Sequence, residues 1–372
     1  MKYYIIAGEA SGDLHGSNLI SEIIKVDSEA KIRGWGGDKM EKAGANIVKH
    51  YSDLAFMGFY EVIINLKIIL NNIKFCKEDI LKFNPDKIIF IDYPGFNLRI
   101  AKWAKLKKNN FKTYYYIAPQ IWAWNEKRIH EIKKNIDHLY VILPFEKEFF
   151  ENKHNYKVNY LGHPLLDSIG DLKKDVKENF IKKNNLDNSK PIIAILPGSR
   201  KQEIKKILSV MIEVVDDFKD YQFIIAAAPN ISSEFFNKTI KNKNVKIISN
   251  KTYQILSISK AAIVTSGTAT LETAILKVPQ VVCYKTSFFS YFLAKIFVNI
   301  KFISLVNLIM NEEIVKELVQ SNCCKESISK ELKNILDNNK RKNLLLKYDE
   351  LISKLGTAGS SKRVAHDIIL NK

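Results

Sequence analysis

The segment IIAGEASGDLHGSNLI, residues 5–20, contains the change of pattern that decides the fold. Its start, up to Ala7, is a short apolar run of the kind that forms a buried strand, and the residues after Asp13 have the spacing of a helix. The turn from Gly8 to Asp13 consists of small and acidic residues. A strand, a tight turn and a helix in this order are the repeating unit of a parallel α/β sheet.

The same alternation continues along almost all of the 372 residues and predicts an α/β protein with two doubly wound, Rossmann-like sheets. Residues 164–190 are polar and charged, and we place the domain boundary there. We expect one domain over 1–165, a second over 190–345, and a helical segment over 346–372 that packs back across the domains. The clearest predicted strands are 3–7, 87–92, 113–118, 139–143, 191–196, 222–227, 245–248, 261–265 and 280–283.

The composition limits the class of protein. With 58 basic and 40 acidic residues the formal net charge is +18, which favours an anionic partner such as nucleic acid, acidic lipid or a phosphorylated substrate. The four cysteines have no metal-ligand or redox spacing, which is typical of a reduced, cytosolic protein. The start of the sequence has no signal-peptide pattern.

Two apolar stretches, residues 56–73 and 286–305, have helical spacing and are interrupted by a few charged residues. Lys295 and Lys301 interrupt the second stretch well short of the ~20 apolar residues of a membrane span. Either one is expected to lie on a membrane surface or to pack in the core.

Ligands of open α/β sheets bind beyond the carboxyl ends of the strands, so the loops after the predicted strands are the candidate sites. One such loop contains Gly198, Ser199 and Arg200, followed by a helix. Glycine allows close approach of the backbone, the helix start presents N–H groups, and arginine can bind phosphate oxygens through two donors. We interpret this loop as a diphosphate site; the alternative is an ordinary turn with a solvated arginine.

A second loop contains Ser266, Gly267 and Thr268, again small and hydroxyl residues at a helix start. Glu272 follows one turn later, where an acidic side chain can accept hydrogen bonds from ribose hydroxyls. This pattern favours a nucleotide site. Alternatively, Thr268 and Glu272 only stabilise the helix end.

The first half offers a candidate base. Asp92 follows a predicted strand, where a carboxylate can act as a general base, although it can also cap a turn. The opening turn supplies Glu9, Ser11 and Asp13 beside Gly12, without the GxGxxG spacing of a dinucleotide fold. Asp13 is either a ligand for substrate hydroxyls or the N-cap of the helix that follows.

Metal-binding patterns are missing from the sequence. No two aspartates stand two residues apart, and the histidines have no ligand spacing such as HExxH. We therefore expect no metal and no cofactor, with Arg200 and helix N-termini stabilising a departing anion.

Taken together, several segments resemble the lipid-A-disaccharide synthase family, in the family's order and over nearly the whole chain. The resemblance implies a GT-B fold and an inverting glycosyltransferase that joins UDP-2,3-diacylglucosamine to 2,3-diacylglucosamine 1-phosphate, giving a β-1,6-linked disaccharide 1-phosphate and UDP. It also implies a cytoplasmic enzyme peripheral to the anionic inner membrane, without a nucleic-acid partner, and a homodimer. The matching segments are GEASGDLHG, MGFYEVI, IDYPGFN, APQIWAWNEKRI, LPFEKEFF, YLGHPLLD, LPGSRKQEI, TSGTATLE and SLVNLIMNEEIVKELVQ.

The resemblance also implies roles for single residues. Val306 departs from the family, which has proline there, and Gly95 stands where some members carry a second aspartate. The implied roles are Asp92 as the base, Glu9 on the acceptor side, Gly198, Ser199 and Arg200 on the diphosphate, Ser266, Gly267, Thr268 and Glu272 on the nucleotide and sugar, and Asn307 on another part of the donor.

Two alternative functions are considered. A UDP-sugar 2-epimerase, or another transferase that uses a UDP-sugar, has the same fold and needs the same nucleotide loops. A basic nucleic-acid-binding module accounts for the charge, but we find no platform of interleaved aromatic and basic residues in the sequence.

Overall fold

The computed structural model describes residues 1–54, 66–106, 111–170, 176–228, 231–240, 244–286 and 300–371. The chain forms two compact units: unit 1 is Met1–Ser168 with Leu355–Lys372, and unit 2 is Ile169–Lys354. The first crossing between the units falls inside the boundary region predicted at 164–190. The predicted C-terminal segment 346–372 is divided between the units at Leu355.

Unit 1 contains a parallel sheet whose strands are β1 (Lys2–Ala7), β2 (Lys31–Gly36), β3 (Asn46–His50), β4 (Lys87–Ile91), β5 (Lys112–Tyr116), β6 (His138–Val141) and β7 (Asn159–Tyr160). The seven strands lie in the order β3-β2-β1-β4-β5-β6-β7. Each strand pairs with its neighbours in parallel, as Ile5 of β1 does with Gly34 of β2 and Ile89 of β4. This is the doubly wound arrangement that the alternating pattern predicts.

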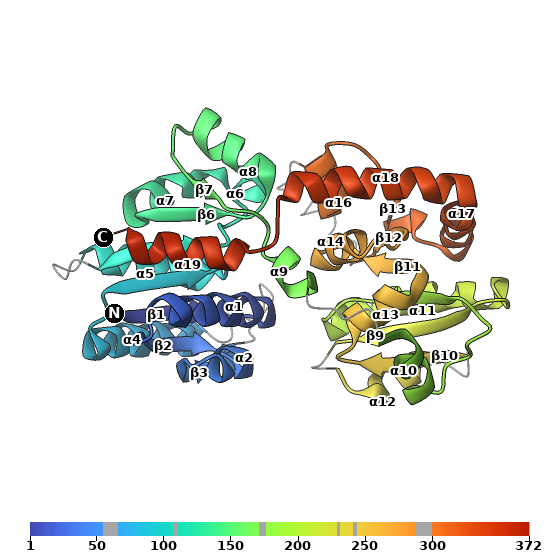
Figure 1. Ribbon diagram of the computed structural model, residues 1–372, viewed down its shortest axis with the longest axis horizontal. Helices are drawn as coiled ribbons and strands as arrows, with labels where there is room; N and C mark the ends of the chain where they lie inside the picture. The colour runs from blue at the N-terminus through green and yellow to red at the C-terminus, as the bar shows by residue number, and fades with distance from the viewer. Residues whose placement is uncertain are drawn as a thin grey trace. The chain divides into compact units, whose positions relative to one another are not determined.

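Helices cover both faces of this sheet, and alternate residues of each strand point to opposite faces (Figure 1). Tyr4 and Ile6 pack with helices α4, α5 and α7, whereas Tyr3 and Ile5 pack with α1 and α19. The described helices of unit 1 are α1 (Ala10–Val26), α2 (Asp38–Lys42), α4 (Leu66–Phe83), α5 (Pro94–Leu106), α6 (Ile121–Trp124), α7 (Ile129–Asn135), α8 (Pro144–Glu148) and α19 (Ser360–Leu370), with η1 (Tyr51–Leu54), η2 (Glu126–Arg128) and η3 (Phe149–Lys153). Helix α9 (Leu165–Gly170) contains the crossing from unit 1 to unit 2.

Unit 2 contains a second parallel sheet, with strands β8 (Ile192–Leu196), β9 (Gln222–Ala227), β10 (Val245–Ser249), β11 (Ser259–Thr265), β12 (Gln280–Tyr284) and β13 (Glu317–Val319). Their order is β10-β9-β8-β11-β12-β13. Its described helices are α10 (Val176–Lys183), α11 (Lys201–Glu213), α12 (Ser233–Ile240), α13 (Thr252–Ile258), α14 (Thr268–Ile275), α16 (Leu305–Met310), α17 (Lys325–Leu336) and α18 (Asn338–Leu355), with η4 (Val214–Asp217) and η5 (Gln320–Asn322).

All the strands predicted from apolar runs are present, and four further strands are not in the prediction: β2, β3, β7 and β13. Three of these lie at sheet edges, where fewer positions are buried and the apolar pattern is weak. The interior strand β2 contains Gly34, where an added Cβ would lie 1.8 Å from the carbonyl oxygen of Ile5. Glycine permits this close approach of two backbones and also weakens the strand pattern.

The last described helix, α19, belongs to the core of unit 1 although it follows unit 2 in the sequence. It packs beside α1, with Val364, Ala365 and Ile368 buried (Figure 1). The Asp167 carboxylate accepts hydrogen bonds from the backbone N–H groups of residues 359–361 at its start. An anion at a helix N-terminus stabilises the helix, so this contact fixes α19 to unit 1.

Candidate functional site

The predicted loops lie at one equivalent place in each sheet. In unit 1, β1 and β4 are neighbours, and in unit 2, β8 and β11 are neighbours. From each pair the chain winds in opposite directions, which makes the gap between their carboxyl ends the ligand-binding switch point of a doubly wound sheet. The loops that contain Glu9 and Asp92 flank the switch point of unit 1, and those that contain Arg200 and Thr268 flank that of unit 2.

The backbone at Asp92 is in a rarely used conformation. Asp92 and Tyr93 have φ angles of 46° and 49°, in the left-handed region that costs non-glycine residues about 1–3 kcal/mol each. Two donors hold the Asp92 carbonyl oxygen: the Tyr115 hydroxyl at 2.6 Å and the Asn97 side-chain amide at 2.7 Å. Such a strained turn persists only where its surroundings fix it, and here Tyr115 and Asn97 do so through the Asp92 carbonyl oxygen.

The Asp92 carboxyl group is a weaker acid than a solvent-exposed aspartate. Burial raises its pKa to about 6, and the Glu9 carboxylate adds to the rise, against the hydrogen bond from the Tyr93 N–H. A base whose pKa lies just below neutral pH is unprotonated in the cell and still takes up a proton readily. The structure thus brings together the predicted residues Glu9 and Asp92.

The opening turn of unit 1 is tightly packed. An added Cβ at Gly8 would lie 2.3 Å from the Tyr93 ring, and one at Gly12 would lie 3.1 Å from the Ala7 side chain. These two glycines therefore allow helix α1 and the Asp92 turn to approach strand β1. Of the predicted ligands, Glu9 is partly buried and Ser11 is exposed.

The N-cap prediction for Asp13 needs correction. Glu9, not Asp13, occupies the N-cap position of α1. The Asp13 carboxylate is buried and accepts hydrogen bonds from the backbone N–H groups of Gly37, Lys39 and Met40, which cap helix α2. This carboxylate therefore orients the start of α2, and its contact with acceptor hydroxyls stays a prediction.

Glu146 is a buried carboxyl group at the same edge of the sheet that the sequence interpretation missed. Its oxygens accept hydrogen bonds from the backbone N–H groups of Ile142 and Leu143 and from the Trp122 indole at 3.0 Å. Burial raises the pKa of Glu146 to about 7, and the Asp92 charge contributes to the rise. Glu146 therefore fixes the orientation of Trp122 close to the Asp92 turn.

In unit 2, the predicted diphosphate loop combines a glycine turn with an arginine at a helix start. Gly198 has a φ of +100°, which favours glycine, and Arg200 occupies the N-cap position of α11. The Arg200 guanidinium makes an exposed ion pair with Glu203, 3.1 Å from Nη1 to Oε1. Exposed pairs contribute only about 0–1 kcal/mol, so a phosphate group can replace Glu203 at little cost.

The second loop of unit 2 meets the first at Thr265. Within the described residues the buried Thr265 hydroxyl makes no hydrogen bond, and its side chain lies 3.8 Å from where a Cβ on Gly198 would be. The ends of β8 and β11 therefore lie close together at this point. Gly267 and Thr268, both exposed, follow at the start of α14.

Two other predicted ligands of unit 2, the Ser266 hydroxyl and the Glu272 carboxyl group, form hydrogen bonds within the protein. The Ser266 hydroxyl donates to the carbonyl oxygen of Ile303 at 2.7 Å. Glu272 accepts from the Tyr253 hydroxyl at 2.9 Å, and burial raises its pKa. Tyr253 was not predicted, because it comes from a different helix, α13.

Asn307 lies in a buried network behind this loop. Its side-chain amide donates to Val315 O and Glu317 Oε1, both at 2.8 Å, and its oxygen accepts from the N–H groups of Ile314 and Val315. Glu317 also accepts from the backbone N–H of Ile303. Asn307 and Glu317 thus position Ile303, whose carbonyl oxygen accepts the hydrogen bond from the Ser266 hydroxyl. Direct contact of Asn307 with the donor stays a prediction.

Two Rossmann-like sheets with a polar loop at each switch point define the GT-B class of nucleotide-sugar enzymes. Among solved structures, a Neisseria meningitidis UDP-GlcNAc 2-epimerase bound to UDP-GlcNAc has a TM-score of 0.70 at 13% identity, each chain covered fully. A glycosyltransferase from Rickettsia africae has a TM-score of 0.57 at 14% identity, covering 100% of this chain and 99% of that one. These likenesses establish the fold.

Sequence comparison identifies the family. Residues 3–368 match the family described as lipid-A-disaccharide synthetase. The lipid-A-disaccharide synthase of Coxiella burnetii (strain Dugway 5J108-111) is 36% identical over 99% of this chain and 98% of its own length. Lipid-A-disaccharide synthase 1 of Legionella pneumophila (strain Paris) is 36% identical over 95% and 93%. The chain belongs to the lipid-A-disaccharide synthetase family.

Proposed function

We propose that this protein is a lipid-A-disaccharide synthase that transfers 2,3-diacylglucosamine from its UDP derivative to the 6-hydroxyl of 2,3-diacylglucosamine 1-phosphate. The observation that carries the proposal is the match to this family over nearly the whole chain. The strained turn at Asp92 and the two loops at the switch point of unit 2 support it, because the reaction needs a base and a diphosphate site.

The proposed reaction is a single displacement. Asp92 takes the proton of the acceptor 6-hydroxyl while that oxygen bonds to the anomeric carbon of the donor. The bond from this carbon to the UDP oxygen breaks on the opposite face, so the configuration is inverted. Arg200 and the N–H groups at the start of α11 stabilise the negative charge on the departing UDP.

The test is release of UDP from UDP-2,3-diacylglucosamine by the purified protein in detergent and EDTA, with and without 2,3-diacylglucosamine 1-phosphate. We expect release only with the acceptor, and unchanged release when EDTA is omitted. Formation of a 2-epimer, without a requirement for acceptor, would replace the proposal by the epimerase alternative. The family match and the full-length relatives favour transfer.

We further propose that the enzyme binds peripherally to the cytoplasmic face of the inner membrane, where both acylated substrates reside. Within the described residues, no helix combines the length and apolar character needed to cross a bilayer. Of the two predicted apolar stretches, residues 56–65 and 287–299 lie outside the described residues. The described part of the first stretch begins α4, whose Ile68, Leu70 and Leu81 are exposed.

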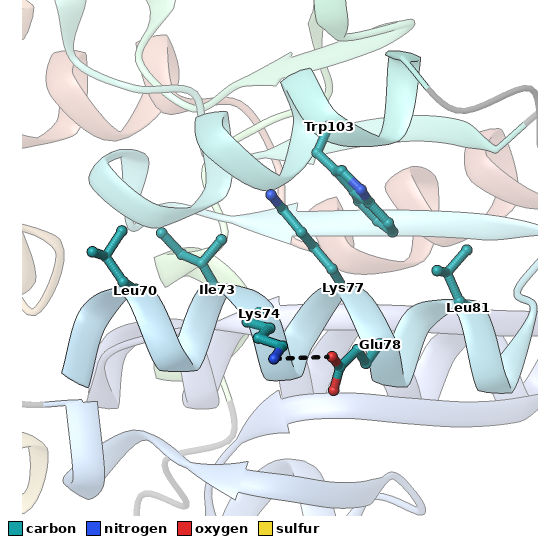
Figure 2. Close-up of a pocket in the computed structure, with 7 residues that line it drawn as sticks. All are labelled: Leu70, Ile73, Lys74, Lys77, Glu78, Leu81 and Trp103. Carbon is teal, nitrogen blue, oxygen red and sulfur yellow. Dashed lines mark ion pairs between the residues drawn. The ribbon is translucent and has the colours of Figure 1, made fainter. Parts of the chain in front are cut away.

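Figure 2 shows the exposed side of α4 that supports this proposal. Leu70, Ile73, Leu81 and the ring of Trp103 from α5 line a shallow pocket of about 360 Å³, with Lys77 beside them. Lys74 and Glu78 also line the pocket and form an ion pair with each other at 4.0 Å. Apolar side chains next to lysines are typical of surfaces that bind anionic membranes.

We expect Leu70→Gln combined with Leu81→Gln to reduce binding to vesicles of acidic phospholipid about tenfold or more, because two leucines lose burial in the lipid. Sedimentation with the vesicles measures the effect. Leu346→Gln, at an exposed position of α18 in unit 2, is the control. Equal vesicle binding by the double variant and the wild type would exclude this side of α4 as the contact.

A further inference from the structure

The segment IWAWNEKR, residues 121–128, has no role in the proposed reaction. It forms α6 and η2 after strand β5, the sheet neighbour of β4, which ends just before Asp92. Its last residue, Arg128, has its guanidinium carbon 4.6 Å from the centroid of the exposed Trp124 ring. A guanidinium stacked on an aromatic ring keeps its edge N–H donors available and loses little further freedom on binding an anion.

Arg128 has no recorded ion-pair partner in the described part of the chain. The neighbouring carboxylate, Glu126, pairs with Lys153 at 2.8 Å and with His154 at 3.0 Å. Glu126 is therefore occupied by Lys153 of η3 and by the His154 ring in the turn after it. Among the described residues, no carboxylate forms an ion pair with Arg128.

The Tyr115 side chain lies near both Arg128 and the proposed base, Asp92. The Tyr115 hydroxyl donates to the Asp92 carbonyl oxygen at 2.6 Å. Burial and the Asp92 charge raise the pKa of this hydroxyl, and the charge of Arg128 acts against them. Tyr115 thus lies within electrostatic reach of both Arg128 and Asp92.

Three other cations of unit 1 are already engaged. Arg33 makes a bidentate pair with Asp79, and Lys105 pairs with Asp137. Lys87 is buried and donates to backbone carbonyl groups at the end of α19. None of these three is free to bind a substrate anion.

We propose that Arg128 binds the phosphate monoester of the acceptor sugar. The inference rests on the proposed function, in which the acceptor carries a phosphate at C1 and reacts at O6 of the same ring. The cation that binds this phosphate must therefore lie about one sugar ring away from the base. Arginine suits a phosphate monoester because two of its N–H groups can bind two phosphate oxygens.

The test compares two acceptors, 2,3-diacylglucosamine 1-phosphate and the same lipid without phosphate. For the phosphorylated acceptor, we expect Arg128→Gln to raise KM about 10- to 100-fold, the range of a hydrogen bond between charged groups. For the acceptor without phosphate, the wild type and the variant have equal KM values. Arg128→Lys restores part of the affinity, because it keeps the charge without the paired donors.

Lys127→Gln, an exposed neighbour in η2, is the matched control, and the donor KM is measured for each variant. Equilibrium binding of each acceptor without donor gives the same comparison in the absence of turnover, so the result does not depend on Asp92 being the base. An equal loss with both acceptors would show that Arg128 acts on the fold only. Unchanged binding of the phosphorylated acceptor in Arg128→Gln would also overturn the proposal.

Discussion

Replacing Asp92 with asparagine should lower kcat by about 10²- to 10⁴-fold, the usual contribution of general-base catalysis. The amide has the same size and leaves the carbonyl contacts with Tyr115 and Asn97 in place, but it cannot accept a proton. The measurement is acceptor-dependent UDP release. Asp53→Asn, in an exposed pair with Lys49, is the control. Full activity of Asp92→Asn would assign the base to another group.

The pH dependence gives a second measurement on the same residue. The base acts in its unprotonated form, so kcat/KM should rise as the pH increases through about 6, the pKa of Asp92, and level off above it. Glu9→Gln removes a like charge that contributes to this raised pKa, and the rise should then occur at lower pH. A midpoint that Glu9→Gln does not move would show that another group controls the profile.

Arg200→Ala should raise the Kd for UDP about 10- to 100-fold, because hydrogen bonds between charged partners contribute about 1.5–3 kcal/mol. In the free protein the guanidinium makes only an exposed pair with Glu203, so its loss should change stability by less than about 1 kcal/mol. Titration calorimetry with UDP measures the affinity. Lys201→Ala, at the adjacent exposed position, is the control. Unchanged affinity in folded Arg200→Ala would refute its assignment to the diphosphate.

The sequence predicts the fold well because each unit repeats one local pattern. Buried strands such as β4 and β8 are continuous apolar runs, and each is followed by a turn and a helix. This local signal also locates Asp92, Arg200 and Thr268, since ligand loops follow strands at fixed places. Edge strands such as β3 have few buried positions and therefore escape the same method.

The partners of the site residues could not be predicted, because they come from distant parts of the chain. Nothing local shows that Tyr115 holds the Asp92 carbonyl or that Tyr253 binds Glu272. The N-cap role predicted for Asp13 was wrong for the same reason: its carboxylate caps a helix that begins 25 residues later, at Asp38. These contacts depend on which strands are neighbours in the folded sheet, and the local sequence does not specify the order of the strands.

The place of α19 has a consequence for synthesis on the ribosome. Residues 360–370 complete the core of unit 1, where the hydroxyl of Tyr114 donates to Asn371 O and that of Tyr140 to Asp367. They are translated after all of unit 2. Until these residues are synthesised, one face of the unit 1 sheet is incompletely covered. By that time the ribosome has synthesised all of unit 2. The second unit can finish folding before the first.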